Sequence, residues 1–373
     1  MRRHKVALFS TSVGAGHTRA AQALESVASD YPLEVEHVDT LSLMPRAFGK
    51  LYRDAYLDVV EHAPQVFSWL FELTDKPFQP DAIRLALEEA SARKFYKFLK
   101  SFQPDLVLCT HFLPTTLAFQ GREKGRGNYC IATVITDFDV HGMWLAAPSD
   151  HYFVAVPEAR AYLRSFGVSS RAITVSGIPT HPSFHSHGDR KELAVKLGLN
   201  PELPTILLSA GGLGSGRLDE TLKAIREVRK RLQVIVVCGR NEELRRSVEE
   251  LATRSDGKEH LVHPLGFTHE FHHYMTCSDV MIGKPGGMTT WESMVKGLPW
   301  IVVDPIPGQE ERNTYHLLEA GIAMWAYEPR TLAYKIEKLL EGDRLQRMTL
   351  NARALAKPEA AAEILNVCSE LLH

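Results

Sequence analysis

The chain is poor in the features that mark secreted or membrane-spanning proteins. Its 373 residues include five cysteines, an odd number with no Cys-x-x-Cys pair. Such sparse use indicates a reducing compartment and argues against a disulfide framework. No apolar run approaches the roughly 20 residues that cross a bilayer, and the N-terminal run Val6–Phe9 is too short for a signal peptide. We therefore expect a cytoplasmic protein, either soluble or held peripherally on the inner face of the membrane.

An excess of charge of either sign is also missing. Forty-three basic residues face forty-five acidic ones, so we expect no nucleic-acid partner. The length is typical of two domains of ordinary size, each with its own core. These features leave the oligomeric state open.

What the chain does contain is a regular alternation of short apolar runs and helix-length segments. The runs are continuous, as is typical of strands buried on both faces of a sheet. The predicted strands are Lys5–Ser10, Leu33–Val38, Leu106–Thr110, Cys130–Thr136, Tyr152–Val156, Thr205–Ser209, Val234–Cys238, Val280–Ile282 and Trp300–Asp304. The predicted helices between them include Thr18–Ser29, Asp81–Phe102, Leu218–Arg231 and Glu242–Arg254. This pattern predicts an α/β fold with two Rossmann-like parallel-sheet domains.

A cluster of turn residues divides the alternation. Two prolines and a glycine interrupt it in the segment Gly177–Pro182. We predict an N-terminal domain over 1–178, a C-terminal domain over 179–357, and a last helix over 358–373 that crosses back to the first domain. Ligands of such domains are expected outside the carboxyl ends of the strands.

A glycine loop follows the first strand of each half, Gly14–His17 in one and Gly211–Gly216 in the other. Neither loop has the Gly-x-Gly-x-x-Gly frame with an acidic residue at the expected distance, and the P-loop pattern is missing. Each loop alone is therefore a weak signal.

The strongest signal is a strand-to-helix turn at Gly286-Gly287. A buried strand is predicted over Ser278–Ile282 and a helix over Met288–Lys296. The N–H groups and dipole at such a helix start favour an anion. Thr289 and Glu292 share one face of this helix, where a hydroxyl suits a phosphate and a carboxylate suits a sugar diol.

A second polar loop carries Gln309 and Glu310 after the predicted strand Trp300–Asp304. Its amide and carboxylate suit the hydroxyls of a hexose. Phosphate, ribose and hexose can thus all be held in this half, which predicts a nucleotide-sugar site.

Six motifs in a fixed order give the chain a resemblance that covers nearly its whole length. They are Ser12–His17, Thr136-Asp137-Phe138 with His141 and Trp144, Gly177-Ile178-Pro179, Gly266-Phe267-Thr268, the Gly286–Glu292 turn, and Pro307-Gly308-Gln309-Glu310 with Asn313. With them the sequence resembles the monogalactosyldiacylglycerol synthase and processive diacylglycerol glucosyltransferase family of glycosyltransferase family 28. The resemblance implies the GT-B architecture, two Rossmann-like domains facing a cleft. It also implies inverting transfer of a hexose from a UDP-sugar to a diacylglycerol-type lipid at a membrane surface, without a metal ion or other cofactor.

The resemblance implies roles on the acceptor side. His17 is the implied base that deprotonates the acceptor hydroxyl, and a helix N-terminus favours the neutral imidazole that this role needs. Asp137 is the alternative base. Ala15 replaces the middle glycine of the family's Gly-Gly-Gly-His pattern, which puts in doubt how closely a ligand approaches that loop. His141 and Trp144 are the implied acceptor positions, with a structural hydrogen-bonded trio with Asp137 as the alternative.

Donor roles are implied in the same way. Glu292 is the implied contact of the ribose diol, and its alternative role is a solvent-facing helix charge. Gln309 and Glu310 are the implied contacts of the transferred sugar, and their alternative is a loop turned to solvent. Phe267 meets the uracil ring through its main chain or else is a core aromatic. The further donor positions are Gly16, Gly212, Leu213, Gly287, Met288 and Thr289.

Other functions remain open from the sequence. His269–His273 satisfies the His-Glu-x-x-His pattern of zinc metallopeptidases, with Glu292 downstream as a third ligand. A predicted strand and a glycine turn lie between the histidine pair and Glu292, which argues against that function. A nucleotide-binding module without catalysis is another alternative. If the protein is a transferase, the sequence leaves open which sugar it transfers and how many it adds. It also leaves open whether the acceptor is another lipid-linked molecule or a soluble one.

Two segments of the first half suit a membrane surface. Leu41–Phe78 mixes bulky apolar residues with basic ones, and a basic cluster follows it. A core-facing helix and a solvated helix face are the alternatives. The cluster consists of Arg93, Lys94, Lys97 and Lys100.

Overall fold

A computed structural model describes residues 3–52, 59, 63–79, 81–186, 188–209, 215–253 and 260–373. The chain forms two units, each with one parallel sheet. The first unit comprises Met1–Pro182, Pro307–Gln309 and Lys357–His373. The second comprises Ser183–Ile306 and Glu310–Ala356. The predicted α/β fold with two parallel sheets is confirmed.

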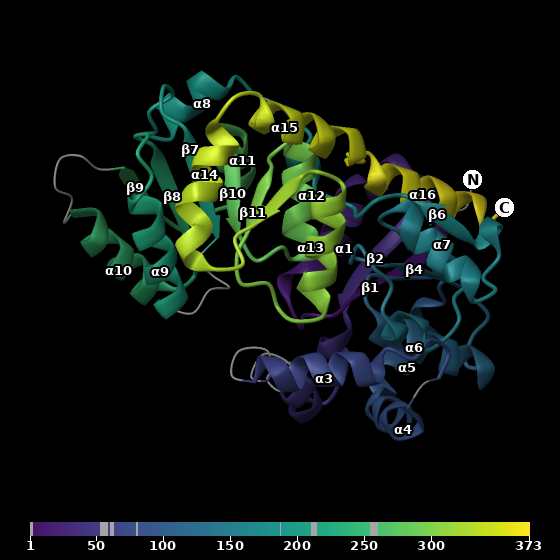
Figure 1. The fold of residues 1–373 in the computed structure, drawn as a ribbon. Helices are drawn as coiled ribbons and strands as arrows, with labels where there is room; N and C mark the ends of the chain where they lie inside the picture. The colour runs from purple at the N-terminus through teal and green to yellow at the C-terminus, as the bar shows by residue number, and fades with distance from the viewer. Residues whose placement is uncertain are drawn as a thin grey trace. The chain divides into compact units, whose positions relative to one another are not determined.

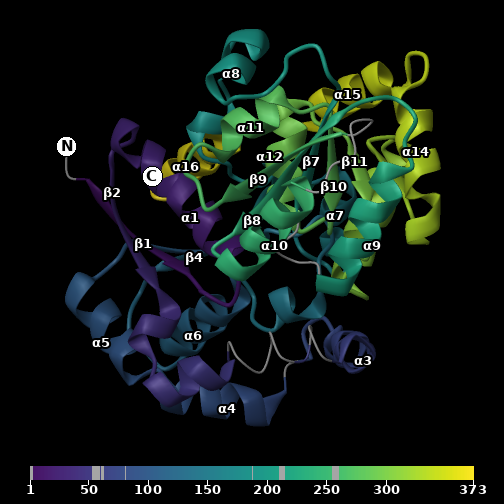
Figure 2. The ribbon, with the colours of Figure 1, turned by 90° about the vertical axis from the view of Figure 1, so that its left-hand side faces the viewer.

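The first unit has a six-stranded sheet in the order β2-β1-β3-β4-β5-β6. Its strands are β1 (His4–Ser10), β2 (Leu33–Asp39), β3 (Leu106–Cys109), β4 (Cys130–Val134), β5 (His151–Val154) and β6 (Ile173–Val175). Its helices are α1 (Ala15–Val27), α3 (Pro64–Thr74), α4 (Ala82–Ser91), α5 (Arg93–Phe102), α6 (Phe112–Glu123), α7 (Pro157–Ser165) and α16 (Ala360–Glu370). Figures 1 and 2 show helices on both faces of this sheet.

Alternate residues of β1 face two different cores. Val6 and Leu8 pack in one cluster with side chains of α1 and α16. Ala7 and Phe9 pack in another with side chains of α5 and α6. All four are fully buried, as expected for a central strand of a sheet covered on both sides.

The second unit has a six-stranded sheet in the order β12-β11-β10-β7-β8-β9. Its strands are β7 (Thr205–Ser209), β8 (Gln233–Gly239), β9 (Leu261–Gly266), β10 (Val280–Gly283), β11 (Trp300–Val302) and β12 (Ala323–Trp325). Its helices are α8 (Arg190–Lys196), α9 (Ser215–Arg226), α10 (Glu242–Thr253), α11 (Phe271–Cys277), α12 (Gly287–Lys296), α13 (Gln309–Glu319), α14 (Leu332–Leu340) and α15 (Arg344–Leu355). Gln309 itself, the first residue of α13, groups with the first unit.

Each sheet has a point where the order of its strands reverses. In the first unit this point lies between β1 and β3, and in the second between β7 and β10. Parallel α/β sheets bind ligands outside the carboxyl ends of the strands at such points, because the flanking connections leave on opposite faces. The segments after β1, β3 and β10 are therefore where each unit can hold a ligand.

One predicted helix boundary is wrong in a way that matters for the site. The helix predicted over Thr18–Ser29 runs from Ala15 to Val27 because Gly14, extended at φ −152°, serves as its N-cap. His17 consequently lies inside the first turn of α1 rather than ahead of the helix.

Candidate functional site

The first group of site residues gathers around His17. Gly14 caps α1, and Gly16 and His17 lie in its first turn. Thr110 directly follows β3 and Thr136 follows β4, so both reach the sheet edge where α1 begins. His17 Nδ1 lies 2.9 Å from the Thr110 carbonyl oxygen and 2.9 Å from the Thr136 hydroxyl oxygen.

The surroundings of His17 favour its neutral form. Burial lowers the pKa of His17 below its ordinary value, although the Asp137 carboxylate and the hydrogen bond to Thr110 raise it in part. The ring of His111 packs edge-to-face on it, with 4.6 Å between ring centroids, and Trp144 lies 6.0 Å away. Burial also holds the pKa of His111 well below its ordinary value. His17 is therefore a neutral imidazole near pH 7, which can accept a proton.

Asp137 is held at both carboxylate oxygens. Trp144 Nε1 donates to Oδ2 at 3.4 Å, and Gln309 Nε2 donates to Oδ1 at 2.9 Å. Gln309 lies 172 positions along the chain but belongs to the same unit. In the described part of the chain no hydrogen bond joins Asp137 to His17, so the carboxylate acts on the imidazole through its charge.

Both nitrogens of His141 have protein partners. Nδ1 accepts from the Met143 N–H at 3.1 Å, which caps the short 3-10 helix η3 (Gly142–Leu145). Nε2 lies 2.7 Å from the Phe71 carbonyl oxygen, and because a carbonyl only accepts, Nε2 donates. Trp144 is 3% exposed. Trp144 bonds to Asp137, whereas these two bonds of His141 go to Phe71 and Met143. Acceptor contact by His141 and Trp144 stays a prediction.

The second group of site residues lies at the start of α12. Gly286 is the N-cap, and the first bond of the helix runs from the Thr290 N–H to the Gly286 carbonyl at 3.0 Å. The N–H groups of Gly287, Met288 and Thr289 precede that bond, in the turn where helices bind anions. This turn follows β10, at the reversal point of the second sheet.

Glu292 is buried one turn further along α12. Its side chain is 2% exposed, which excludes the alternative of a solvent-facing helix charge. A buried carboxylate is costly unless hydrogen-bond donors surround it. Glu292 therefore has a structural or binding role, in line with the predicted ribose contact.

Glu310 lies against the same turn. Its side chain is 9% exposed, and Oε2 accepts from the Ile306 N–H at 2.8 Å. A Cβ placed on Gly286 would lie 3.5 Å from Glu310 Oε1. Asn313 Nδ2 donates to the Pro285 carbonyl at 3.0 Å and ties α13 to this turn. The burial of Glu310 excludes a loop turned to solvent, and it places a carboxylate beside the predicted diphosphate position.

The remaining predicted donor residues have different outcomes. Phe267 follows β9 and is 55% exposed, so it is no core aromatic. Its ring instead packs under the Arg240 guanidinium, 4.6 Å from the centroid, and beside His269 at 5.1 Å. Gly212 and Leu213 lie outside the described residues.

The zinc alternative lacks its helix. His269 precedes α11, whereas His273 lies within it, so the two do not stand one turn apart on a helix as this motif requires. Glu292 is buried in α12. Within the described ranges, no group of three or more His, Cys, Asp and Glu residues is placed to hold a metal ion.

Sequence reasoning missed Thr110 and His111 and did not connect Thr136 with His17. The available signal was position, since Thr110 and Thr136 each end a predicted strand. The signal was not sufficient, because the order of the strands in the sheet could not be determined from the sequence. His111 follows directly and is the N-cap of α6.

Two Rossmann-like units, each with a six-stranded parallel sheet, are typical of the GT-B class of proteins. Acinetobacter baumannii MurG superposes with a TM-score of 0.66 at 15% identity, covering 99% of each chain. UDP-GlcNAc 2-epimerase from Neisseria meningitidis superposes with a TM-score of 0.62 at 13% identity, covering 98% of this chain and all of the other. At these identities the likeness shows the fold, which transferases and epimerases share.

The sequence comparisons identify the family. Residues 17–180 match the monogalactosyldiacylglycerol (MGDG) synthase family, and residues 205–367 match the glycosyltransferase family 28 C-terminal domain. Processive diacylglycerol beta-glucosyltransferase of Staphylococcus carnosus is 32% identical over 282 residues, 75% of this chain and 70% of the relative. The protein of that name from Staphylococcus aureus MRSA252 is 26% identical over 374 residues, 99% and 92% of the two chains. The chain belongs to this family of glycosyltransferases, as its motifs predicted.

Proposed function

We propose that the protein transfers a hexose from a UDP-sugar to a diacylglycerol-type lipid with inversion at the anomeric carbon. The similarity to diacylglycerol glucosyltransferases over both units carries this proposal. The site supports it, because a neutral imidazole follows β1 and an anion-binding turn follows β10. No cofactor is proposed.

In the proposed reaction His17 takes the proton of the lipid hydroxyl as its oxygen attacks the anomeric carbon. The bond from that carbon to the UDP oxygen breaks on the opposite face, and UDP leaves with the electron pair. The N–H groups of Gly287, Met288 and Thr289 stabilise the charge on the departing diphosphate. Glu292 holds the ribose diol, and Gln309 and Glu310 read the hexose hydroxyls.

A donor-by-acceptor screen tests the proposed activity. Purified protein is mixed with UDP-glucose, UDP-galactose or UDP-N-acetylglucosamine and with diacylglycerol in vesicles, and the products are identified by mass spectrometry. The expected result is a glycosylated diacylglycerol, with one UDP released from the donor for each hexose transferred. Transfer only to a soluble or another lipid-linked acceptor would refute the acceptor class, and UDP release without any glycosylated product would refute transfer.

Chelation tests the proposal that backbone amides replace a metal ion. Dialysis against EDTA is expected to leave the transfer rate unchanged, because the α12 turn supplies the positive potential for the diphosphate. The rate is measured in the same assay with and without added Mg²⁺ or Mn²⁺. A loss of activity that either cation restores would contradict the role of the amides.

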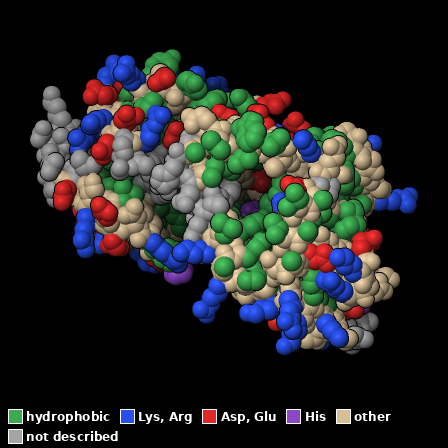
Figure 3. Space-filling model, turned by 90° about the horizontal axis from the view of Figure 1, so that it is seen from below, with side chains coloured by type: hydrophobic (Ala, Val, Ile, Leu, Met, Phe, Trp, Pro, Cys, Tyr) green, Lys and Arg blue, Asp and Glu red, His purple; other side chains and the backbone are tan. Residues whose placement is uncertain are grey.

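We propose further that the first unit binds a membrane surface peripherally. In the described residues no helix is long and apolar enough to cross a bilayer. Large apolar side chains nevertheless stand in solvent on α3 and α4, and hydrophobic and basic side chains gather together on the face of this unit seen in Figure 3. The exposed residues are Val66, Trp69, Leu70, Leu73, Ile83 and Leu87.

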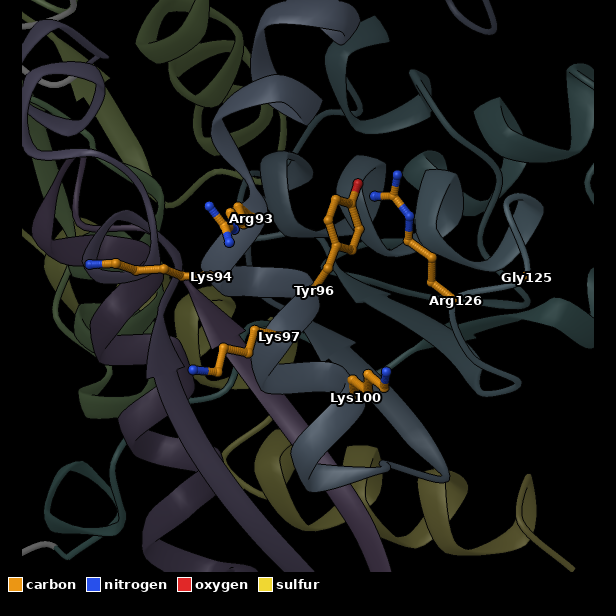
Figure 4. A pocket seen from close by; sticks show the side chains of 7 residues that line it. All are labelled: Arg93, Lys94, Tyr96, Lys97, Lys100, Gly125 and Arg126. Carbon is orange, nitrogen blue, oxygen red and sulfur yellow. The ribbon is translucent and has the colours of Figure 1, made fainter.

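Basic side chains on the adjoining α5 complement an anionic membrane. Together with Tyr96 and Arg126 they line an open cavity of about 790 Å³. Figure 4 shows the Arg126 guanidinium beside Tyr96, with Lys94 and Lys97 extending to the opposite side. The Arg126 guanidinium stacks on Tyr96, 4.1 Å from its ring centroid. Among the described residues the four cations of α5 form no ion pair, so their charge is available to lipid phosphates. They are Arg93, Lys94, Lys97 and Lys100.

Charge reversal on α5 tests this surface. Lys97→Glu with Lys100→Glu is expected to weaken binding to phosphatidylglycerol vesicles at least about 30-fold, since each basic residue near an anionic surface contributes about 1 kcal/mol and both contributions are lost. Vesicle sedimentation measures the binding, with phosphatidylcholine vesicles as reference. The control is Lys223→Glu with Lys230→Glu, which changes the charge of exposed sites in the second unit equally. Equal binding by both double variants would contradict the proposed surface.

A further inference from the structure

The hydrogen bonds of His17 determine which ring nitrogen carries its proton. The Thr110 carbonyl oxygen lies 2.9 Å from Nδ1. A carbonyl oxygen has no proton to give, so Nδ1 must be the donor. In a neutral imidazole only one nitrogen is protonated, and Nε2 therefore carries the lone pair.

The Thr136 hydroxyl is the second oxygen at this nitrogen, also 2.9 Å from Nδ1. Because the Nδ1 proton already points to Thr110, the hydroxyl oxygen accepts a share of it in a three-centre hydrogen bond. Two oxygens on different strand ends thus restrain the ring, one after β3 and one after β4.

Thr110 also fixes the backbone of His17. Its hydroxyl donates to the His17 carbonyl oxygen at 2.9 Å, while its own N–H donates to Phe9 at 2.9 Å and continues the pairing of β1 with β3. The sheet edge therefore holds both the main chain and the ring of His17. A restraint built on sheet pairing is rigid. A catalytic base needs such rigidity, because it must face the proton that it accepts.

The carboxylate that could have oriented His17 has other partners. Both oxygens of Asp137 accept hydrogen bonds, from Trp144 and from Gln309. The other nearby imidazole, His111, uses Nδ1 to accept from the Leu113 N–H at 3.0 Å. Neither residue offers an acceptor to His17 Nδ1 in place of the threonines.

We propose that Thr136 is a positioning residue that, together with the Thr110 carbonyl, holds His17 as the Nδ1–H tautomer with Nε2 as the proton acceptor. The use of Nε2 in transfer depends on the function proposed above, whereas the tautomer does not. A threonine and a carbonyl thus take the place that a carboxylate often has beside a catalytic histidine.

Nitrogen NMR of histidine-labelled protein tests the tautomer directly. The His17 signals, assigned by their loss in His17→Gln, are expected to show a protonated Nδ1 and an unprotonated Nε2 in the wild type at pH 8. Thr136→Val is expected to shift the signals toward a mixture of tautomers, whereas Thr136→Ser retains the wild-type pattern. A protonated Nε2 in the wild type would overturn the proposal.

Kinetics provide the second readout. Thr136→Val is expected to lower kcat about fivefold, the scale of one lost hydrogen bond, with an unchanged KM for the UDP-sugar, and Thr136→Ser is expected to restore kcat. The matched control is Thr133→Val in β4, whose hydroxyl bonds to Thr115 and Ser149 rather than to His17. Wild-type kcat and a wild-type NMR pattern in Thr136→Val would refute the role. Full activity in His17→Gln would refute the proposed role of His17 as the base while leaving the tautomer result intact.

Discussion

His17→Ala is expected to lower the rate of hexose transfer about 10²- to 10⁴-fold, the usual contribution of a general base. The affinity for UDP is expected to stay the same, because His17 lies in the first unit and the turn proposed to bind the diphosphate lies in the second. Transfer is measured by mass spectrometry of the lipid product, and UDP binding by calorimetry. Loss of UDP binding in the folded variant would show that His17 belongs to the donor site instead.

The pH dependence of the wild type serves as the control for this role. Burial lowers the pKa of His17, so the base stays unprotonated down to pH values below the ordinary histidine pKa of about 6.5. The decrease of kcat/KM on the acid side should therefore occur below that pH. The residual activity of His17→Ala should not show this decrease. Asp137→Asn separates the two candidate bases: it should retain measurable transfer, because the imidazole and its threonine partners remain.

Glu292→Ala is expected to weaken UDP binding about 10- to 100-fold, since hydrogen bonds to a charged group contribute roughly 1.5–3 kcal/mol. The side chain is 2% exposed on α12, so its removal also leaves a space beside the proposed ribose position. Calorimetric titration of UDP measures the effect. Uridine without phosphates should lose affinity by the same factor, because the contact is with the sugar.

Two further variants show whether this effect is local. Glu292→Gln keeps the shape of the side chain and tests the charge if the alanine variant does not fold. Glu319→Ala removes an exposed carboxylate from α13 and should bind UDP as the wild type does. Unchanged UDP affinity in both Glu292 variants would remove this residue from the donor site.

The sequence predicted the parts of the site that depend on local pattern. A continuous apolar run, a glycine pair and a helical segment together located the turn between β10 and α12, and the turn occurs there. The burial of Glu292 was not predicted, because a charge on a helix faces solvent as readily as a site. The family motifs predicted the fold because they span both units.

Contacts between distant segments were beyond the sequence. Asp137 and Gln309 are joined by a hydrogen bond across 172 residues, and Thr110 meets His17 across 93. Such pairs depend on strand order, which the alternation of elements does not encode. The sequence left Phe267 as either a core or a surface residue because aromatic residues suit both places, and its contact with Arg240 depends on a segment distant in the chain.

A crystal structure with bound UDP-hexose tests the central claim most directly. We predict the diphosphate at the start of α12, with its oxygens within hydrogen-bond distance of the Gly287, Met288 and Thr289 N–H groups and no metal ion between them. The ribose hydroxyls are predicted to meet the Glu292 carboxylate. A diphosphate bound at any other place, or one that reaches the protein through a metal ion, would contradict the account.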